Sequence, residues 1–280
     1  MIRRSMICVV VLATLATACS EPEPDAANED NAAAAPADDC AGDALLECAR
    51  ASTIGDLVPE QATAAEGDPI TIGMINQENT PAGSYPELSQ GVDAAIAFVN
   101  EQLGGLDGRP IELEVCNTNF SAEGSTSCGQ QFVEEEVPVV MGGIDVFGNG
   151  IEVLADNEIP FVGGIPISEQ SVTSPNSFQW SGGSWGATVA FADWAANELE
   201  AEKVAIVYGE FGSITQSAEY AQTVLERSGV TTQLVPYPIL ATDVSSAIQA
   251  AATGEPDAIF MLAADAGCAS LDRSHRSGRV

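Results

Sequence analysis

The sequence predicts an α/β fold with two lobes, each built on a parallel β-sheet, and a second lobe that is incomplete. From residue 69 onward, short apolar runs alternate with longer segments whose apolar residues recur every three or four positions. This is the pattern of strands that alternate with amphipathic helices. The alternation starts again near residue 181. Strands and helices in alternation form parallel sheets with right-handed crossovers.

The first lobe, residues 69–180, is expected to have the order βαβαβαβ. Its first helix has the most regular pattern, an apolar stripe that ends at Gly104-Gly105. The stripe consists of Leu88, Val92, Ile96, Val99 and Leu103. The expected strands are 70–75, 111–116, 137–141 and 159–163, and the expected helices are 88–103, 122–136 and 151–157.

The second lobe, residues 181–271, repeats this design and then stops. Because the alternation ends after residue 263, we expect the last strand to leave an unpaired sheet edge. Residues 272–280, DRSHRSGRV, hold three of the nine basic residues and the single histidine, without apolar periodicity. A truncated or frame-shifted terminus fits this anomalous tail, and a functional basic tail is the alternative. The expected helices are 187–200, 217–228 and 244–252, and the expected strands are 204–208, 231–237 and 258–263.

The N-terminal residues have the features of a secretory signal. Two arginines, an apolar run over residues 6–15 and three small residues precede Cys19. Residues 1–18 are therefore predicted to be a signal peptide and Cys19 a lipidation site. An ordinary signal peptide that contains a cysteine is the alternative. Residues 19–39, rich in Ala, Pro, Asp and Glu, are expected to be a lipid-anchored, acidic, disordered tether, and residues 40–68 a small cysteine-clipped segment.

The chain is strongly acidic. Its net charge of −32 comes from 41 acidic and 9 basic residues, so nucleic-acid binding is not expected. Two interpretations remain, a surface that binds cations and an acidity that serves solubility, and the second is preferred. Beyond the signal, no segment approaches the roughly 18 uninterrupted apolar residues that a membrane helix needs. We expect that part of the chain to be soluble.

Four cysteines lie in two close pairs, Cys40 with Cys48 and Cys116 with Cys128. Export would place them in an oxidising compartment, so two local disulfides are expected, with Cys268 as an odd thiol. Zinc binding is the competing interpretation. Neither pair has CxxC spacing or a histidine nearby, so no metal is expected.

Several segments, in a fixed order, resemble the branched-chain amino acid type of periplasmic binding protein, a substrate-binding lipoprotein of ABC transporters. These segments are ITIGMINQENTPAGSY, QGVDAAIAFVNEQLGGLDGRPIELEVCNTN, VVMGGIDVFGNG, NEIPFVGGIPISE, EKVAIVYGEFG and PDAIFMLAADAG. The match covers Pro69 to Ser270. The resemblance implies the type I periplasmic-binding-protein fold, with two Rossmann-like lobes.

The resemblance also implies a function. Such a receptor captures a small solute, here an amino acid, an amide or a related molecule, between its lobes and delivers it to an ABC permease. It would be exported and held by its N-terminal lipid on the extracytoplasmic face of the cell membrane, in the periplasm or at the cell surface. Neither a cofactor nor enzymatic activity is implied. A tethered ligand-sensing domain of the same fold is the alternative.

The resemblance places the ligand in the loops that follow the strands of both lobes. Asp145 stands where amino-acid binders of the family usually have serine hydroxyls for the ligand carboxylate. A neutral or cationic solute is therefore as well supported as a branched-chain amino acid. The expected ligand-binding residues are Glu78, Asn79, Tyr85, Asp145, Val146, Phe147, Pro166, Ser168, Phe211 and Asp265.

Structural roles are the alternative for several of these side chains. Asp145 is suited to cap the helix that follows it. Tyr85 and Phe211 are large aromatic residues of the kind that pack within a lobe. Ser168 is suited to a turn.

The segment GGSWG, residues 182–186, matches the GxSxG motif of α/β-hydrolases. Ser184 would be the nucleophile and His275 the base, with Asp243, Asp257 or Asp265 as the third member. The strand before the motif is short and polar, and the histidine lies in the anomalous tail. A secreted serine hydrolase is therefore the less favoured alternative.

Overall fold

The computed structural model describes residues 7–10, 44–52, 58–80, 83–263 and 270. Their contacts divide the chain into two compact units. The larger unit holds residues 1–14, 73–89 and 115–280, and the smaller unit holds residues 15–72 and 90–114. Cys19, the expected tether, Cys40, Asp265 and the tail lie outside the described residues.

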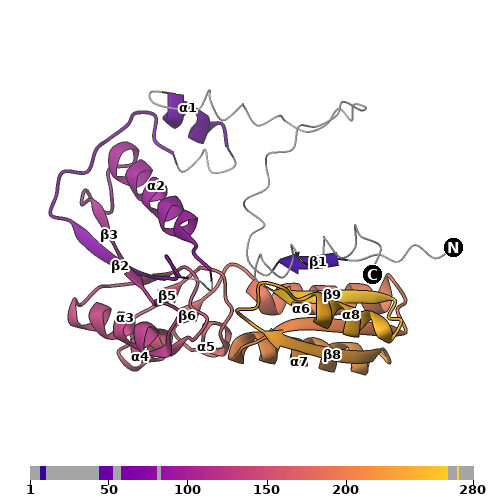
Figure 1. Ribbon diagram of the computed structural model, residues 1–280. Coiled ribbons are helices and arrows are strands. Elements are labelled where there is room, and N and C mark those ends of the chain that lie inside the picture. The colour runs from indigo at the N-terminus through magenta and orange to yellow at the C-terminus, as the bar shows by residue number, and fades with distance from the viewer. Residues whose placement is uncertain (1–6, 11–43, 53–57, 81–82, 264–269, 271–280) are drawn as a thin grey trace. The chain divides into compact units, whose positions relative to one another are not determined.

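One parallel sheet of the larger unit has the strand order β1-β9-β7-β8. Its core has two faces, as alternation along a strand requires. Ile206 and Phe260 pack with residues of α6 and α7, whereas Val207 and Met261 pack with residues of α8. The strands and helices of this sheet can be followed in Figure 1. The elements are β1 (Ile7–Val10), α6 (Gly183–Asn197), β7 (Lys203–Glu210), α7 (Gly212–Arg227), β8 (Thr231–Pro238), α8 (Ser245–Thr253) and β9 (Ala258–Ala263).

The edge of β9 differs from the expectation. In place of an unpaired edge, β9 pairs in parallel with β1, in a register that aligns Ile7 with Phe260 and Val10 with Ala263. An edge strand presents a row of unpaired N–H and C=O groups, and a short extended segment can satisfy them. The segment that does so belongs to the expected signal peptide.

The other parallel sheet has the strand order β3-β2-β4-β5-β6. Phe132, Ile151 and Leu154, from helices α3 and α4, pack with Val140 and Phe161 from two of its strands. The elements are β2 (Ile70–Asn76), α2 (Pro86–Gln102), β3 (Ile111–Asn117), α3 (Ala122–Glu134), β4 (Val140–Gly142), α4 (Asn149–Asp156), β5 (Phe161–Val162), α5 (Glu169–Thr173) and β6 (Ser177–Phe178).

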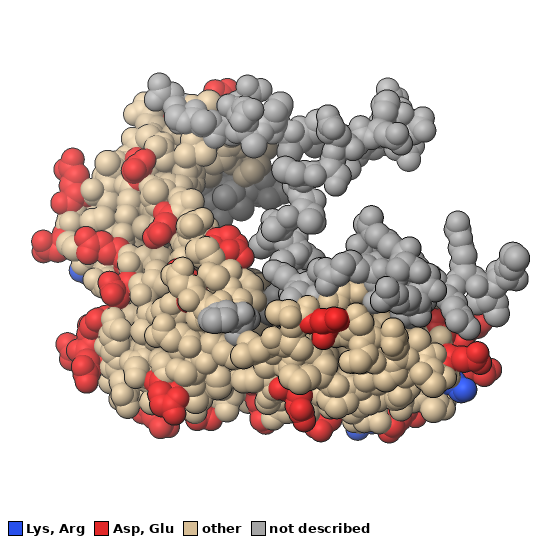
Figure 2. Space-filling view, viewed as in Figure 1, with Lys and Arg blue, Asp and Glu red and all other residues tan. Residues whose placement is uncertain are grey.

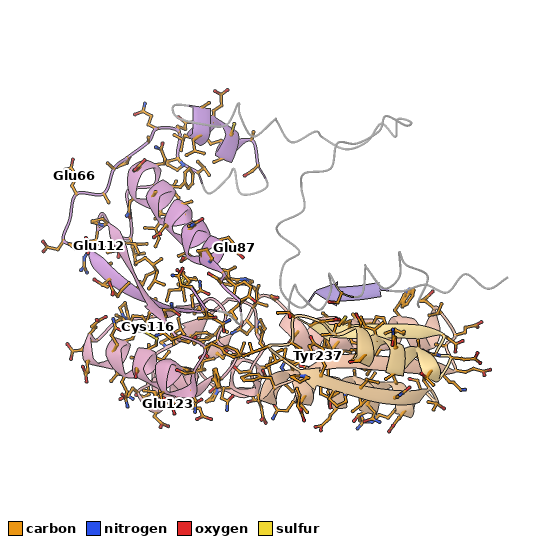
Figure 3. The ribbon with its side chains drawn as sticks, viewed as in Figure 1. Glu66, Glu87, Glu112, Cys116, Glu123 and Tyr237 are labelled. Carbon is orange, nitrogen blue, oxygen red and sulfur yellow. A yellow bond between two sulfur atoms is a disulfide. The ribbon has the colours of Figure 1, made fainter. Side chains whose placement is uncertain are left out.

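A disulfide joins Cys116 on β3 to Cys128 on α3, with their Cα atoms 5.5 Å apart (Figure 3). This is one of the two predicted bonds. Cys128 is fully buried in the core, where it packs with Phe132. The bond closes a segment with a sequence separation of 12 residues and ties the end of a strand to the helix that follows it.

The smaller unit contains the short helix α1 (Leu45–Arg50) and the segment that leads into β2. Cys48 lies on α1 and is disulfide-bonded. Its predicted partner, Cys40, is outside the described residues. The amides of Thr63 and Ala65 donate to carbonyls at the end of α2, at 3.0 and 2.8 Å. Backbone hydrogen bonds thus hold this segment against a helix.

Acidic side chains are spread over the visible face of the molecule, with few basic ones between them (Figure 2). Within the described part of the chain, no helix is both long enough and apolar enough to cross a membrane. In the same part, His, Cys, Asp and Glu form no group of three or more that could hold a metal ion.

Candidate ligand-binding site

A cavity of about 310 Å³ opens in the larger unit. Three chain segments form it: the loop after β4, the start of α5 and the start of α7. Each segment follows the carboxyl end of a parallel strand, where open α/β sheets bind ligands. The lining residues are Val146, Phe147, Ser168, Glu169, Gln170, Phe211, Gly212, Ser213 and Gln216.

Three phenylalanines form an aromatic cluster at this cavity. The rings of Phe120 and Phe211 are stacked, with centroids 5.1 Å apart. Phe147 meets Phe120 and Phe211 edge-on, at centroid distances of 5.6 and 5.1 Å. Stacked and edge-on pairs are the favoured arrangements of aromatic rings. Phe147 and Phe211, which contact each other edge-on, therefore give the cavity an aromatic part of its lining.

The α5 side of the cavity is polar. Ser168 is the N-cap of α5, and its buried hydroxyl oxygen accepts a hydrogen bond from the amide of Ser171 at 3.3 Å. The next residue, Glu169, is exposed and accepts a bond from Gln216 of α7 at 3.4 Å. Gln170 donates to Glu152 of α4 at 2.9 Å. Ser168 thus fills the turn role proposed from the sequence and also lines the cavity.

The α7 side differs, because the start of this helix has no side-chain cap. Phe211 is the N-cap and its side chain has no oxygen that could accept a hydrogen bond, and the first turn contains no acidic residue. Ser213 is 6% exposed, and its hydroxyl oxygen has no hydrogen-bond partner among the described residues. The hydroxyl of Ser217, one turn later, is buried and unpartnered in the same sense.

Asp145 is buried beside the cavity, where it serves the loop and the following helix. Ser125 donates to its carboxylate at 2.6 Å and the amide of Phe147 donates at 3.1 Å. Ser125 in turn accepts from the amide of Gly150 at 2.7 Å. Burial raises the pKa of Asp145, and the bond from Ser125 opposes that rise. This arrangement is close to the capping role that the sequence offered as an alternative.

The loop between β2 and α2 forms a network of its own. The carboxylate of Glu78 accepts hydrogen bonds from Asn76 at 3.0 Å and from Ser89 at 2.7 Å. Tyr85 is 7% exposed and packs with Val146 in a small apolar cluster. The amide of Asn79 donates to the hydroxyl of Ser84 at 2.9 Å. Glu78 is thus held by hydrogen bonds and Tyr85 by apolar packing, whereas Asn79 takes part through its backbone amide.

The cavity brings together four of the residues expected from the sequence: Val146, Phe147, Ser168 and Phe211. Asp145 and Pro166 line a second cavity of about 10 Å³, and Glu78, Asn79 and Tyr85 line neither. Sequence reasoning missed Glu169, Gln170, Gly212, Ser213 and Gln216. The available signal was the small polar run directly after the strand at residue 210, which is typical of a helix start.

The structure does not support the hydrolase alternative, because its expected nucleophile, Ser184, is buried. Ser184 lies in the first turn of α6, is 1% exposed, and donates to the carbonyl of Pro166 at 3.4 Å. The next side chain, Trp185, donates to the carbonyl of Ile167 at 2.9 Å. His275 lies outside the described residues. The GxSxG segment here anchors the start of a helix to the loop after β5.

The profile of the periplasmic binding protein family matches residues 69–277. The chain belongs to that family. The match covers every segment that lines the cavity and every strand of the two sheets except β1. At family level its relatives are solute-binding proteins, not enzymes. A search of curated proteins finds no match.

Solved structures resemble this periplasmic binding protein in fold. A leucine-binding protein from Thermotoga maritima has a TM-score of 0.64 at 15% identity, over 75% of this chain and 61% of the other. A solute-binding protein of an ABC transporter from Rhodopseudomonas palustris, in complex with p-hydroxybenzoic acid, has a TM-score of 0.62 at 22% identity. That match covers 76% of this chain and 60% of the other. A branched-chain amino acid transporter substrate-binding protein from Streptococcus pneumoniae, in complex with isoleucine, has a TM-score of 0.57 at 16% identity. That match covers 69% of this chain and 57% of the other. The chain thus spans about three fifths of the length of these proteins.

Proposed function

We propose that this periplasmic binding protein is an extracytoplasmic receptor that captures a small solute in the 310 Å³ cavity and delivers it to an ABC importer. The observation that carries the proposal is the position of the cavity, which is lined by loops at the carboxyl ends of parallel strands. A volume near 300 Å³, with apolar walls and a few polar groups, is typical of a site for a small molecule. Nothing in this arrangement requires covalent chemistry.

The solved structures with similar folds suggest which solutes should be tested first. They include a leucine-binding protein and complexes with isoleucine and with p-hydroxybenzoic acid. Amino acids and ring-bearing acids are therefore the first candidates, and amides remain candidates from the sequence. The ring walls of Phe147 and Phe211 suit an apolar portion in any of them.

The proposal includes a location. Cys19 would carry a lipid after signal removal, and the acidic segment up to residue 39 would tether the receptor to the extracytoplasmic face of the cell membrane. The disulfide between Cys116 and Cys128 supports export, because such bonds persist in oxidising compartments. The partner in the membrane would be an ABC permease.

A thermal-shift and calorimetric titration with leucine, isoleucine, p-hydroxybenzoic acid and their amides tests the function. A solute at 100 times its Kd should stabilise the protein by about 2.7 kcal/mol, because it binds only the folded state. Phe211→Ala should weaken binding at least tenfold, since it removes a cavity wall and a buried ring contact. Phe178→Ala is the matched control, because Phe178 is 58% exposed and does not line the cavity. The absence of stabilisation by every solute would refute the proposal.

A further inference from the structure

The first turn of α7 contributes Gly212 and Ser213 to the cavity lining and has no side-chain cap among the described residues. Helix α3 begins at Ser121, whose hydroxyl oxygen accepts from the amide of Gly124, and α5 begins at Ser168, which does the same for Ser171. Within the described residues the start of α7 has no such side-chain acceptor, as is also the case for α4, α6 and α8, and of these four starts only that of α7 lines the cavity. The first amides of a helix need acceptors from outside the helix, because they have none within it. At α7 these amides belong to Gly212, Ser213 and Ile214.

Charge strengthens this observation. The chain has 41 acidic residues, yet the first turn of α7 contains none. A helix N-terminus carries a partial positive charge and favours an anion beside it. Two carboxylates lie near this start, that of Glu210 before the N-cap residue and that of Glu169 in the cavity lining. Both side chains are exposed, so water screens their charges from a ligand's carboxylate.

The hydroxyl of Ser213 is the second, independent sign of a ligand. Ser213 lines the cavity, is 94% buried by its 6% exposure, and has no hydrogen-bond partner among the described residues. A buried hydroxyl without a partner is costly, so it is normally satisfied by protein, water or ligand. A carboxylate at the start of α7 would accept from this hydroxyl and from the free amides together.

We propose that the start of α7 and the Ser213 hydroxyl form a subsite for the carboxylate of a ring-bearing solute, and that Phe147 and Phe211 contact its ring. This deepens the proposed function and rests on it. Gly212, Ser213 and the rings of Phe147 and Phe211 line the same cavity, which is sized for a small molecule. The solute class is a flat monocarboxylate.

Glu169 sets a limit on this subsite. Among the described lining residues it alone has an acidic side chain, and none has a basic one; it is exposed and accepts a hydrogen bond from Gln216. A bound carboxylate is repelled by it, although water screens an exposed charge. Replacing Glu169 with Gln should therefore raise the affinity for a solute with a carboxylate and leave the affinity for a neutral amide unchanged.

The test uses benzoate and benzamide as probes, with calorimetry on the full chain. Ser213→Ala should weaken benzoate about tenfold, because it removes a hydrogen bond to a charged group. Ser217→Ala is the matched control: it removes another buried, unpartnered hydroxyl from the same helix, outside the cavity lining, and should leave the affinity unchanged. Glu169→Gln should raise the affinity for benzoate about twofold to fivefold and leave the affinity for benzamide unchanged. Unfolding curves without solute show whether each variant is folded.

The outcomes separate the two proposals. Binding of leucine or isoleucine without binding of benzoate overturns the carboxylate subsite for ring-bearing solutes and keeps the receptor function. Equal losses of benzoate affinity in Ser213→Ala and Ser217→Ala also overturn it. Failure of every probe and every solute to bind overturns both.

Discussion

At the scale of single residues, Asp145 is a carboxyl group that the fold buries almost completely. Its side chain is 5% exposed and is held by Ser125 and by the amide of Phe147. Loss of hydration disfavours the charged form, and the hydrogen bonds recover only part of that cost. The loop that presents Val146 and Phe147 to the cavity is therefore organised around an ionisable group.

Asp145 should make stability depend on pH. Its pKa is raised in the folded state, so the folded state binds this proton more tightly than the unfolded chain does. Its contribution is fully present below the pKa of an unfolded Asp and is lost as the pH rises through the raised folded value. The free energy of unfolding of the wild type should fall, relative to Asp145→Asn, over that interval. Urea unfolding from about pH 3.5 to 7 measures the difference.

The control for this prediction is Asp156→Asn, at an exposed position on α4. Its unfolding free energy should follow the wild type across the pH range. Other carboxyl groups and the net charge of −32 also act on stability, and only the difference between the variants isolates Asp145. Parallel curves for the wild type and Asp145→Asn would contradict the prediction.

At the scale of single elements, two glycines allow the effect of tight packing on stability to be measured apart from the effect of backbone flexibility. Gly73 lies in β2, and a Cβ there would be 2.8 Å from ring carbons of the buried Phe132. Gly91 lies in α2 with no atom within 4 Å of such a Cβ. Gly73→Ala should lower the free energy of unfolding by roughly 1–3 kcal/mol, because the core is already filled. Gly91→Ala should raise it by roughly 0.4–1 kcal/mol, because alanine favours the helix.

Thermal or urea unfolding of the two variants checks this pair. Each serves as the control for the other, since both add one methyl group to a regular element. Equal effects at the two positions would mean that the Phe132 ring can move aside. That result would contradict the close packing described for the sheet that contains β2.

The helix and strand order was predictable from the sequence because it rests on apolar periodicity. The last strand, β9, was predicted with the bounds that the structure has, since all six of its residues are buried and apolar. Helix α7 was expected from residue 217 and begins at Gly212. Its first turn is small and polar, so the apolar stripe appears only in the second turn. The missed turn is the one that lines the cavity.

The site was less predictable than the fold for a related reason. Phe147 and Phe211 stand out in sequence as aromatic residues in loops, and both line the cavity. Glu169 and Gln216 are ordinary surface residue types, and only tertiary structure brings them within hydrogen-bond distance. Tyr85 has the same appearance as the two phenylalanines but packs into the apolar cluster beneath them. Residue type alone does not separate these cases.

At the scale of the whole molecule, the ends of the chain meet in one sheet, where β1 lies against β9. A chain that begins at Ser20 lacks β1. We expect the amides of residues 258–263 to exchange faster with solvent in that shorter chain, because β9 becomes an edge strand. Hydrogen exchange of the two chains measures this. Strand β7 is the internal control, since it keeps both neighbours, and equal protection of β9 in both chains would contradict the prediction.

The bond between Cys116 and Cys128 also sets an order of events. Cross-linking a loop of this size stabilises a fold by about 3 kcal/mol, and a reducing cytoplasm withholds that contribution. A chain exported as proposed would therefore be less stable while still inside the cell. Crossing the membrane would then act as the step that locks β3 to α3. The same covalent link that strengthens the receptor at its destination would not hinder its passage, because it closes only on arrival.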